Sequence, residues 1–156
     1  MSPLAENIAK VKEAIVRAAR EAGRDPAEVT LVAATKVQTS DTIRAAIAAG
    51  VTICGENRVQ EMTAHLDDNA YAGSALHFIG HLQTNKVKYV VGRVDMIESV
   101  DSLRLAQAIA SASRKRGIVT DVLVEVNIGG EAAKSGIAPE AAEDLRTAKF
   151  RHISGM

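Results

Sequence analysis

The chain has 156 residues, of which 47% are hydrophobic and 24% charged, an ordinary globular composition with enough apolar material for one core. Lysine plus arginine and aspartate plus glutamate both number 19, so no net positive field would draw the protein to nucleic acid or to an anionic membrane surface. A single cysteine excludes an intramolecular disulfide, and no apolar run approaches the roughly 20 residues that a membrane span requires.

Apolar periodicity, helix caps and glycine stops predict helices and strands that alternate along the chain. The first helix shows these signals well, because Ser2 and Pro3 suit an N-cap and the first helical position, and Gly23 suits the end. The expected strands are short and mostly apolar, as in a sheet covered on both faces. In chain order we expect a helix over residues 3–22, a strand over 29–35, a helix over 40–49, a strand over 51–54, a helix around 59–66, a strand over 77–79, a short helix around 87–90, a strand over 96–100, a helix over 102–116, a longer strand over 119–128 and a helix over 139–145.

This alternation predicts an α/β fold with right-handed βαβ crossovers and a parallel sheet. Five βα units are present, and residues 150–156 look like the approach to a sixth strand. A TIM-type (β/α)8 barrel takes about 250 residues, so the chain would supply one incomplete barrel domain over residues 1–156. A finished doubly wound sheet of five strands is the alternative. Periodicity alone does not choose between the two architectures.

Lys36 is the first candidate functional residue, because it stands at the carboxyl end of the first expected strand. In either parallel architecture, that end of the sheet carries the binding and catalytic groups. Apolar neighbours such as Val32 and Val37 could partly desolvate the amine, which disfavours the ammonium form and leaves a nucleophile able to condense with an aldehyde. The alternative is a solvated lysine at a strand end.

Further polar candidates follow other expected strands: Asn57 after the second, His81 after the third and Asn127 at the end of the fifth. Each could orient a polar ligand, but the residues around Asn57 by themselves favour a strand-to-helix turn in which it caps the helix. No cysteine or carboxylate lies at ligand spacing beside His77 and His81, so no metal site is expected. Neither glycine-rich phosphate fingerprint occurs, which removes the usual support for nucleotide binding. Cys54, at the end of an apolar strand, is best interpreted as a small core residue.

Taken together, five segments resemble the pyridoxal-phosphate homeostasis protein family, small relatives of the alanine racemase N-terminal barrel. They are residues 31–36 (LVAATK), 55–61 (GENRVQE), 77–86 (HFIGHLQTNK), 99–102 (SVDS) and 124–134 (VEVNIGGEAAK) followed by Gly136. The match departs from the family at Leu76, where an aromatic residue is expected before the histidine. Five matches in the right order make the resemblance specific.

The resemblance implies a TIM-type barrel that holds pyridoxal 5'-phosphate as a Schiff base on Lys36, with Asn57, His81 and Asn127 also near the cofactor. It further implies a protein that buffers or delivers the cofactor, its small-molecule partner, without established turnover. The balanced charge, the single cysteine and the lack of a long apolar run separately predict a cytoplasmic protein with neither nucleic acid nor membrane among its partners. A full-length member is expected to be a monomer.

Two alternatives stay open at this point. One is a racemase-like enzyme that uses the same Schiff base, although racemases of this fold pair the lysine with a second acid–base group from another domain. The other is a truncated chain that binds no cofactor, because the later loops that bind phosphate in the family are not in this sequence. Open sheet edges also predict that the 156-residue chain, when folded, occurs either with further residues that complete the barrel or with a second chain that covers the open edge, as in self-association.

Overall fold

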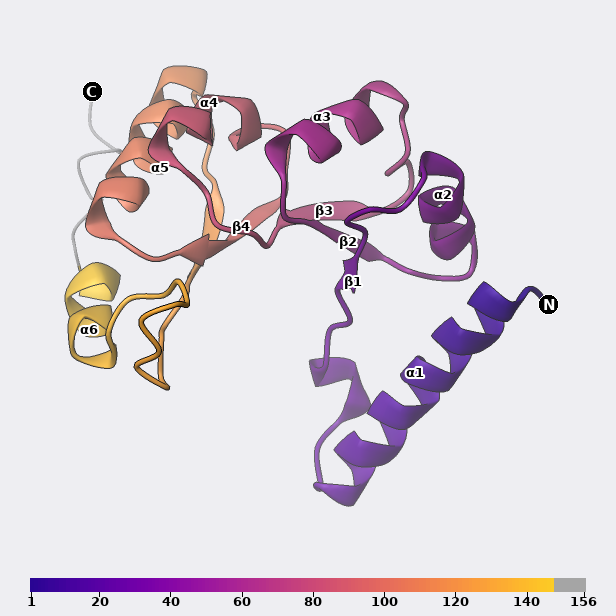
Figure 1. Ribbon diagram of the computed structural model, residues 1–156. Helices are drawn as coiled ribbons and strands as arrows, with labels where there is room; N and C mark the ends of the chain where they lie inside the picture. The colour runs from indigo at the N-terminus through magenta and orange to yellow at the C-terminus, as the bar shows by residue number, and fades with distance from the viewer. Residues whose placement is uncertain (148–156) are drawn as a thin grey trace. The chain divides into compact units, whose positions relative to one another are not determined.

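The computed structural model describes residues 1–147, along which short strands alternate with helices (Figure 1). The expected approach to a sixth strand, residues 150–156, lies outside the described residues. The helices are α1 (Pro3–Glu21), α2 (Ser40–Ala48), α3 (Val59–Asp67), α4 (Val87–Val90), α5 (Leu103–Arg116) and α6 (Pro139–Thr147), with 3-10 turns η1 (Pro26–Glu28) and η2 (Thr84–Lys86). The strands are β1 (Ala33–Ala34), β2 (Ile53–Glu56), β3 (Ala75–Phe78), β4 (Met96–Val100) and β5 (Asp121–Val124).

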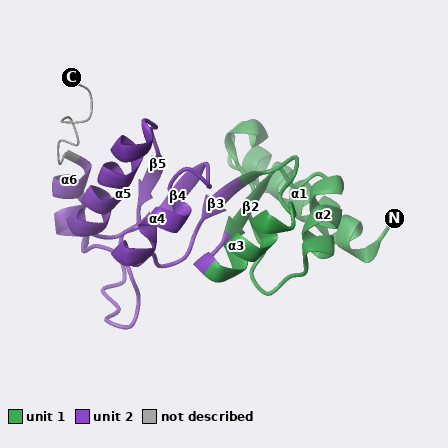
Figure 2. Cartoon of the chain, turned by 90° about the horizontal axis from the view of Figure 1, so that it is seen from above, with its two compact units in different colours: residues 1–55, 60–75 green, residues 56–59, 76–156 purple. Residues whose placement is uncertain are grey.

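The chain forms two compact units, which Figure 2 shows in different colours. The first comprises residues 1–55 and 60–75, and the second comprises residues 56–59 and those from 76 onward. In the first unit β1 pairs in parallel with β2, and in the second β4 pairs in parallel with both β3 and β5. The parallel pairing confirms the predicted α/β class.

The order of the strands distinguishes the two architectures that periodicity left open. The strands follow one another as β1-β2-β3-β4-β5, which is their order in the chain. A doubly wound sheet reverses its strand order at a switch point, whereas a (β/α) barrel adds each strand beside the preceding one. The observed order therefore agrees with the partial TIM-type barrel of five βα units.

Local capping signals are confirmed at several helix ends. The Ser2 hydroxyl accepts a hydrogen bond from the Ala5 amide at 3.2 Å, and the Ser102 hydroxyl accepts one from the Leu105 amide at 3.1 Å. Gly117 ends α5 with a φ of 65°, a left-handed conformation that glycine adopts without steric cost. These ends were predictable because each depends only on residues within one helical turn.

Two strands are shorter than the sequence predicts. The expected strand over residues 29–35 is reduced to Ala33–Ala34, and the expected long strand over 119–128 is reduced to Asp121–Val124. Strand β5 ends early because its partner β4 ends at Val100, whose carbonyl accepts a hydrogen bond from the Glu125 amide. Beyond that point the Asn127 amide donates to the Ile137 carbonyl instead of to a strand of the sheet. A ladder needs a partner strand along its whole length, which a run of apolar residues does not reveal.

Each unit has its own buried core. In the first unit Ile43, Met62 and Cys54 are all buried, and the full burial of Cys54 confirms its interpretation as a core residue. In the second unit the core includes Phe78 and Ile97 from the strands, together with several residues of α4 and α5. Within residues 1–147, no helix combines the length and the apolar character that crossing a membrane requires.

Candidate functional site

Lys36 lies in a tight turn that directly follows β1. The Gln38 amide donates to the Thr35 carbonyl at 3.2 Å, which closes a β-turn with Lys36 and Val37 at its centre. The Thr35 amide continues the pairing with β2 by donating to the Gly55 carbonyl at 2.9 Å. The Lys36 side chain is exposed and makes no hydrogen bond or ion pair within residues 1–147. The amine is thus accessible, but the expected desolvation by Val37 is absent, because that valine is 76% exposed.

The backbone of this turn is strained at Val37, whose φ is 56°. β-branched residues rarely adopt this left-handed region, and a non-glycine residue held there costs on the order of 1–3 kcal/mol. In the described part of the chain, Asn69 is the other non-glycine residue with a positive φ, and asparagine tolerates it well. The strain therefore lies next to the candidate nucleophile.

Two side chains of α3 contact the same turn. The Glu61 carboxylate accepts a hydrogen bond from the Val37 amide at 3.0 Å, and His65 Nε2 lies 3.1 Å from the Gln38 carbonyl oxygen. A carbonyl only accepts, so Nε2 is the donor in the second contact. Four residues apart, Glu61 and His65 share one face of the helix. Sequence reasoning assigned neither residue a role.

Asn57 follows β2 and lies against the glycine turn that follows β3. A side chain at Gly80 would place its Cβ 2.4 Å from the Asn57 carbonyl oxygen and 2.5 Å from its Cα, so the two backbones touch. Asn57 Oδ1 is buried and has no hydrogen-bond partner among the described residues. A buried acceptor without a donor is costly, so this oxygen is a candidate contact for a ligand hydroxyl or N–H group.

His81 follows Gly80 and extends toward the end of β4. Its Nδ1 lies 3.4 Å from Asp101 Oδ2, which is an ion pair only when the imidazole is protonated. The His81 side chain is mostly exposed and that of Asp101 is mostly buried. The structure thus brings Asn57 close to Gly80, the residue before His81.

Asn127 uses its side chain to brace its own loop. Its Nδ2 donates to the Glu131 carbonyl at 2.8 Å, and its Oδ1 accepts from the Glu131 amide at 3.3 Å. Gly136, with a φ of 110°, approaches the Asn127 backbone so closely that an added Cβ would lie 2.7 Å from the Asn127 nitrogen. Both polar atoms of the Asn127 side chain thus bind the Glu131 backbone, so this side chain stabilises the loop.

A partly buried pair that the sequence did not indicate joins β3 to β4. His77 Nδ1 lies 2.6 Å from Glu98 Oε1, and 11% and 25% of the respective side chains are exposed. His77 pairs with Met96 in the parallel register, and residues two apart share a face, so Glu98 lies on the same face as His77. A carboxylate that contacts Nδ1 fixes the orientation of the ring. The sequence shows both residues, but their separation of 21 positions hides the contact.

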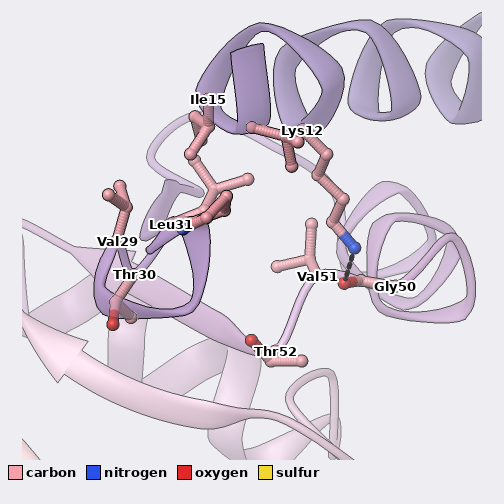
Figure 3. A pocket seen from close by; sticks show the side chains of 10 residues that line it. Lys12, Ile15, Val29, Thr30, Leu31, Gly50, Val51 and Thr52 are labelled. Atoms are coloured by element: carbon pink, nitrogen blue, oxygen red, sulfur yellow. Dashed lines mark hydrogen bonds between the residues drawn. The ribbon is translucent and has the colours of Figure 1, made fainter. Parts of the chain in front are cut away.

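The first unit also has an apolar pocket of about 360 Å³, lined in part by the residues that lead into the amino ends of β1 and β2 (Figure 3). Ile15 from α1 and Leu31 line it, and Lys12 closes one side by donating from Nζ to the Gly50 carbonyl at 2.5 Å. Lys36 does not line this pocket. In a parallel sheet, the amino ends of the strands are the end associated with stability, so we assign the pocket no binding role.

The chain is similar in sequence and in fold to known proteins of one family. The family model described as the alanine racemase N-terminal domain matches residues 4–154. The pyridoxal phosphate homeostasis protein of Aquifex aeolicus is 41% identical over 90% of this chain and 61% of its own length, so the chain spans about three-fifths of that curated relative. The crystal structure of a protein from Bifidobacterium adolescentis is 40% identical, with a TM-score of 0.84 over 91% of this chain and 62% of its own.

A further solved structure is described with a ligand. PipY of Synechococcus elongatus, determined with PLP bound, is 28% identical, with a TM-score of 0.75 over 94% of this chain and 66% of its own. The family match covers almost the whole chain, and the relatives agree with it in fold. The chain therefore belongs to the alanine racemase N-terminal domain family, and its resemblance to the pyridoxal phosphate homeostasis proteins is confirmed.

Proposed function

We propose that this chain binds pyridoxal 5'-phosphate and acts in cofactor homeostasis, by buffering or delivering the cofactor, which it holds as a Schiff base on Lys36. The observation that carries the proposal is the accessible Lys36 amine, presented by a constrained turn at the carboxyl end of β1. The relative determined with PLP bound supports the choice of cofactor. When bound, this cofactor supplies an aldehyde, with which an amine condenses with loss of one water.

The described residues fit such a ligand in part. The buried Asn57 Oδ1 needs a donor, and a phenolic hydroxyl such as that of the cofactor is one. His81 is largely exposed after the neighbouring strand and remains a proposed contact. Asn127 also remains proposed, as a residue that shapes its loop and contributes to the site through the loop backbone. We also predict that residues 1–156 form one partial barrel domain and that the protein is located in the cytoplasm.

Borohydride reduction followed by peptide mapping tests the proposal. After incubation with the cofactor, we expect the reduced adduct on Lys36, and Lys36→Ala should abolish the visible absorbance of the bound cofactor. The exposed Lys36 side chain contributes little to packing, so the variant should keep its fold. Lys10→Ala, which removes another exposed lysine of the same unit, is the matched control and should bind like the parent. An adduct spread over several lysines would remove Lys36 from this role.

The family match to an alanine racemase domain favours a racemase-like enzyme as the second candidate. Amino-acid turnover separates the two candidates. We expect no racemisation or transamination, whereas a rate constant of about 1–1000 per second, the usual enzyme range, would favour the enzyme.

A further inference from the structure

The turn after β1 has a geometry that its sequence disfavours. A β-turn with a positive φ at its third residue only is of type II, and that position normally requires glycine. In the turn Thr35–Gln38 this residue is Val37, with a φ of 56°, while Lys36 occupies the second position and has no positive φ. Because Val37 is 76% exposed, burial of its side chain does not stabilise the turn.

The contacts from α3 supply the missing stabilisation. A carboxylate that accepts a backbone N–H forms a charge-assisted hydrogen bond, about twice as strong as a neutral one. Glu61 accepts from the strained residue itself at 3.0 Å, and His65 holds the Gln38 carbonyl one turn farther along the helix. His65 is itself oriented by the Tyr71 hydroxyl, 3.1 Å from Nδ1. The helix thus holds the peptide group between Lys36 and Val37 and the one that follows Gln38, on either side of the strained residue.

We propose that Glu61 is a positioning residue for Lys36, which deepens and rests on the proposed function. Its carboxylate holds Val37 in the left-handed conformation and so keeps the Lys36 side chain in one direction at the end of β1. Without this contact the turn relaxes toward conformations that valine prefers, and Lys36 samples other directions. A lysine fixed in a reactive geometry condenses faster with a bound aldehyde than one that must first be ordered.

The test measures the rate at which borohydride traps pyridoxal 5'-phosphate on Lys36 in the full chain, together with hydrogen exchange of the residue-37 amide and urea unfolding. Glu61→Ala should slow trapping about tenfold and accelerate exchange at Val37, because a hydrogen bond to a charged group is lost. Glu61→Gln retains an acceptor oxygen, so its trapping rate should lie between those of the parent chain and Glu61→Ala. Glu13→Ala removes an exposed carboxylate of α1 and should leave trapping unchanged.

Rescue by a second substitution separates positioning from a general structural role. Glycine adopts a positive φ without strain, so Val37→Gly combined with Glu61→Ala should restore most of the trapping rate that Glu61→Ala loses. Loss of trapping in Glu61→Ala without rescue in the double variant would overturn the proposal, as would trapping at the parental rate in Glu61→Ala. If the alanine variant does not fold, slower trapping by a folded Glu61→Gln variant supports the proposal, and an unchanged rate overturns it. A parent chain with no adduct on Lys36 would instead overturn the proposed function and, with it, the positioning role.

Discussion

At the scale of single residues, the backbone at two positions, Val37 and Gly80, constrains the candidate site. Val37 has a positive φ, which valine disfavours, and Gly80 lies so close to Asn57 that any side chain at this position would clash with it. Both positions lie next to candidate cofactor contacts, Lys36 and His81 respectively. Backbone constraints of this kind are retained when the surrounding structure compensates for them.

Gly80→Ala should destabilise the protein strongly. Its new Cβ would lie 2.4–2.6 Å from the Asn57 carbonyl oxygen, Cα and Cβ, and backbone cannot move aside as a flexible side chain can. We expect a loss of about 3 kcal/mol in the free energy of unfolding, at the upper end of overpacking costs. Urea denaturation measures it.

Gly129→Ala is the matched control for this prediction. Its φ is not positive, and the nearest atom to an added Cβ is Glu131 Oε1 at 3.4 Å, the end of a flexible side chain. The change should remain within about 0.5 kcal/mol, as for an ordinary surface substitution. Equal stability of the two variants would contradict the close approach of Gly80 to Asn57.

At the scale of elements, the polar contact between β3 and β4 is the one with the clearest energetic consequence. Glu98→Met should leave the buried His77 Nδ1 without its partner at 2.6 Å and cost about 1–3 kcal/mol in the free energy of unfolding. His77→Phe with Glu98→Met removes both polar groups and should cost less than the single change. A double-mutant cycle by urea unfolding measures the coupling.

The exposed pair Arg24–Glu28 serves as the comparison for that cycle. Its side chains are 58% and 59% exposed, so solvent screens the ion pair and Glu28→Ala should cost no more than about 0.5 kcal/mol. Additive effects of the two substitutions at His77 and Glu98 would show that the pair is not coupled.

At the scale of the whole molecule, β5 is the last strand of the order within residues 1–147 and exposes apolar side chains. Val122 and Leu123 are 40% and 49% exposed, and an open edge with apolar residues is a template for pairing with another chain. We expect the 156-residue chain on its own to self-associate, with an average mass that rises with concentration in sedimentation experiments.

Leu123→Lys should weaken this self-association, because a charge at a sheet edge opposes pairing. Val11→Lys, which adds the same charge at a 47% exposed position of α1, should leave the association unchanged. A chain that stays monomeric at all concentrations, or that responds equally to both substitutions, would exclude association through β5.

The sequence by itself determined the features that depend on near neighbours in the chain. The alternation of elements, the cap at Ser2 and the glycine end of α5 follow from signals within one or two turns. The position of Lys36 after the first strand was predictable for the same reason, although the strand itself is shorter. The family, too, was recognisable from residues alone.

Only the tertiary structure decided the features that depend on distant partners. The strand order, which agrees with a barrel rather than a doubly wound sheet, is a choice among pairings that periodicity does not encode. Glu61 meets Val37 across 24 positions and Glu98 meets His77 across 21, and neither contact leaves a local pattern. Such contacts form because packing brings their elements together, so the residues that hold the candidate nucleophile in place could not be read from the sequence that contains it.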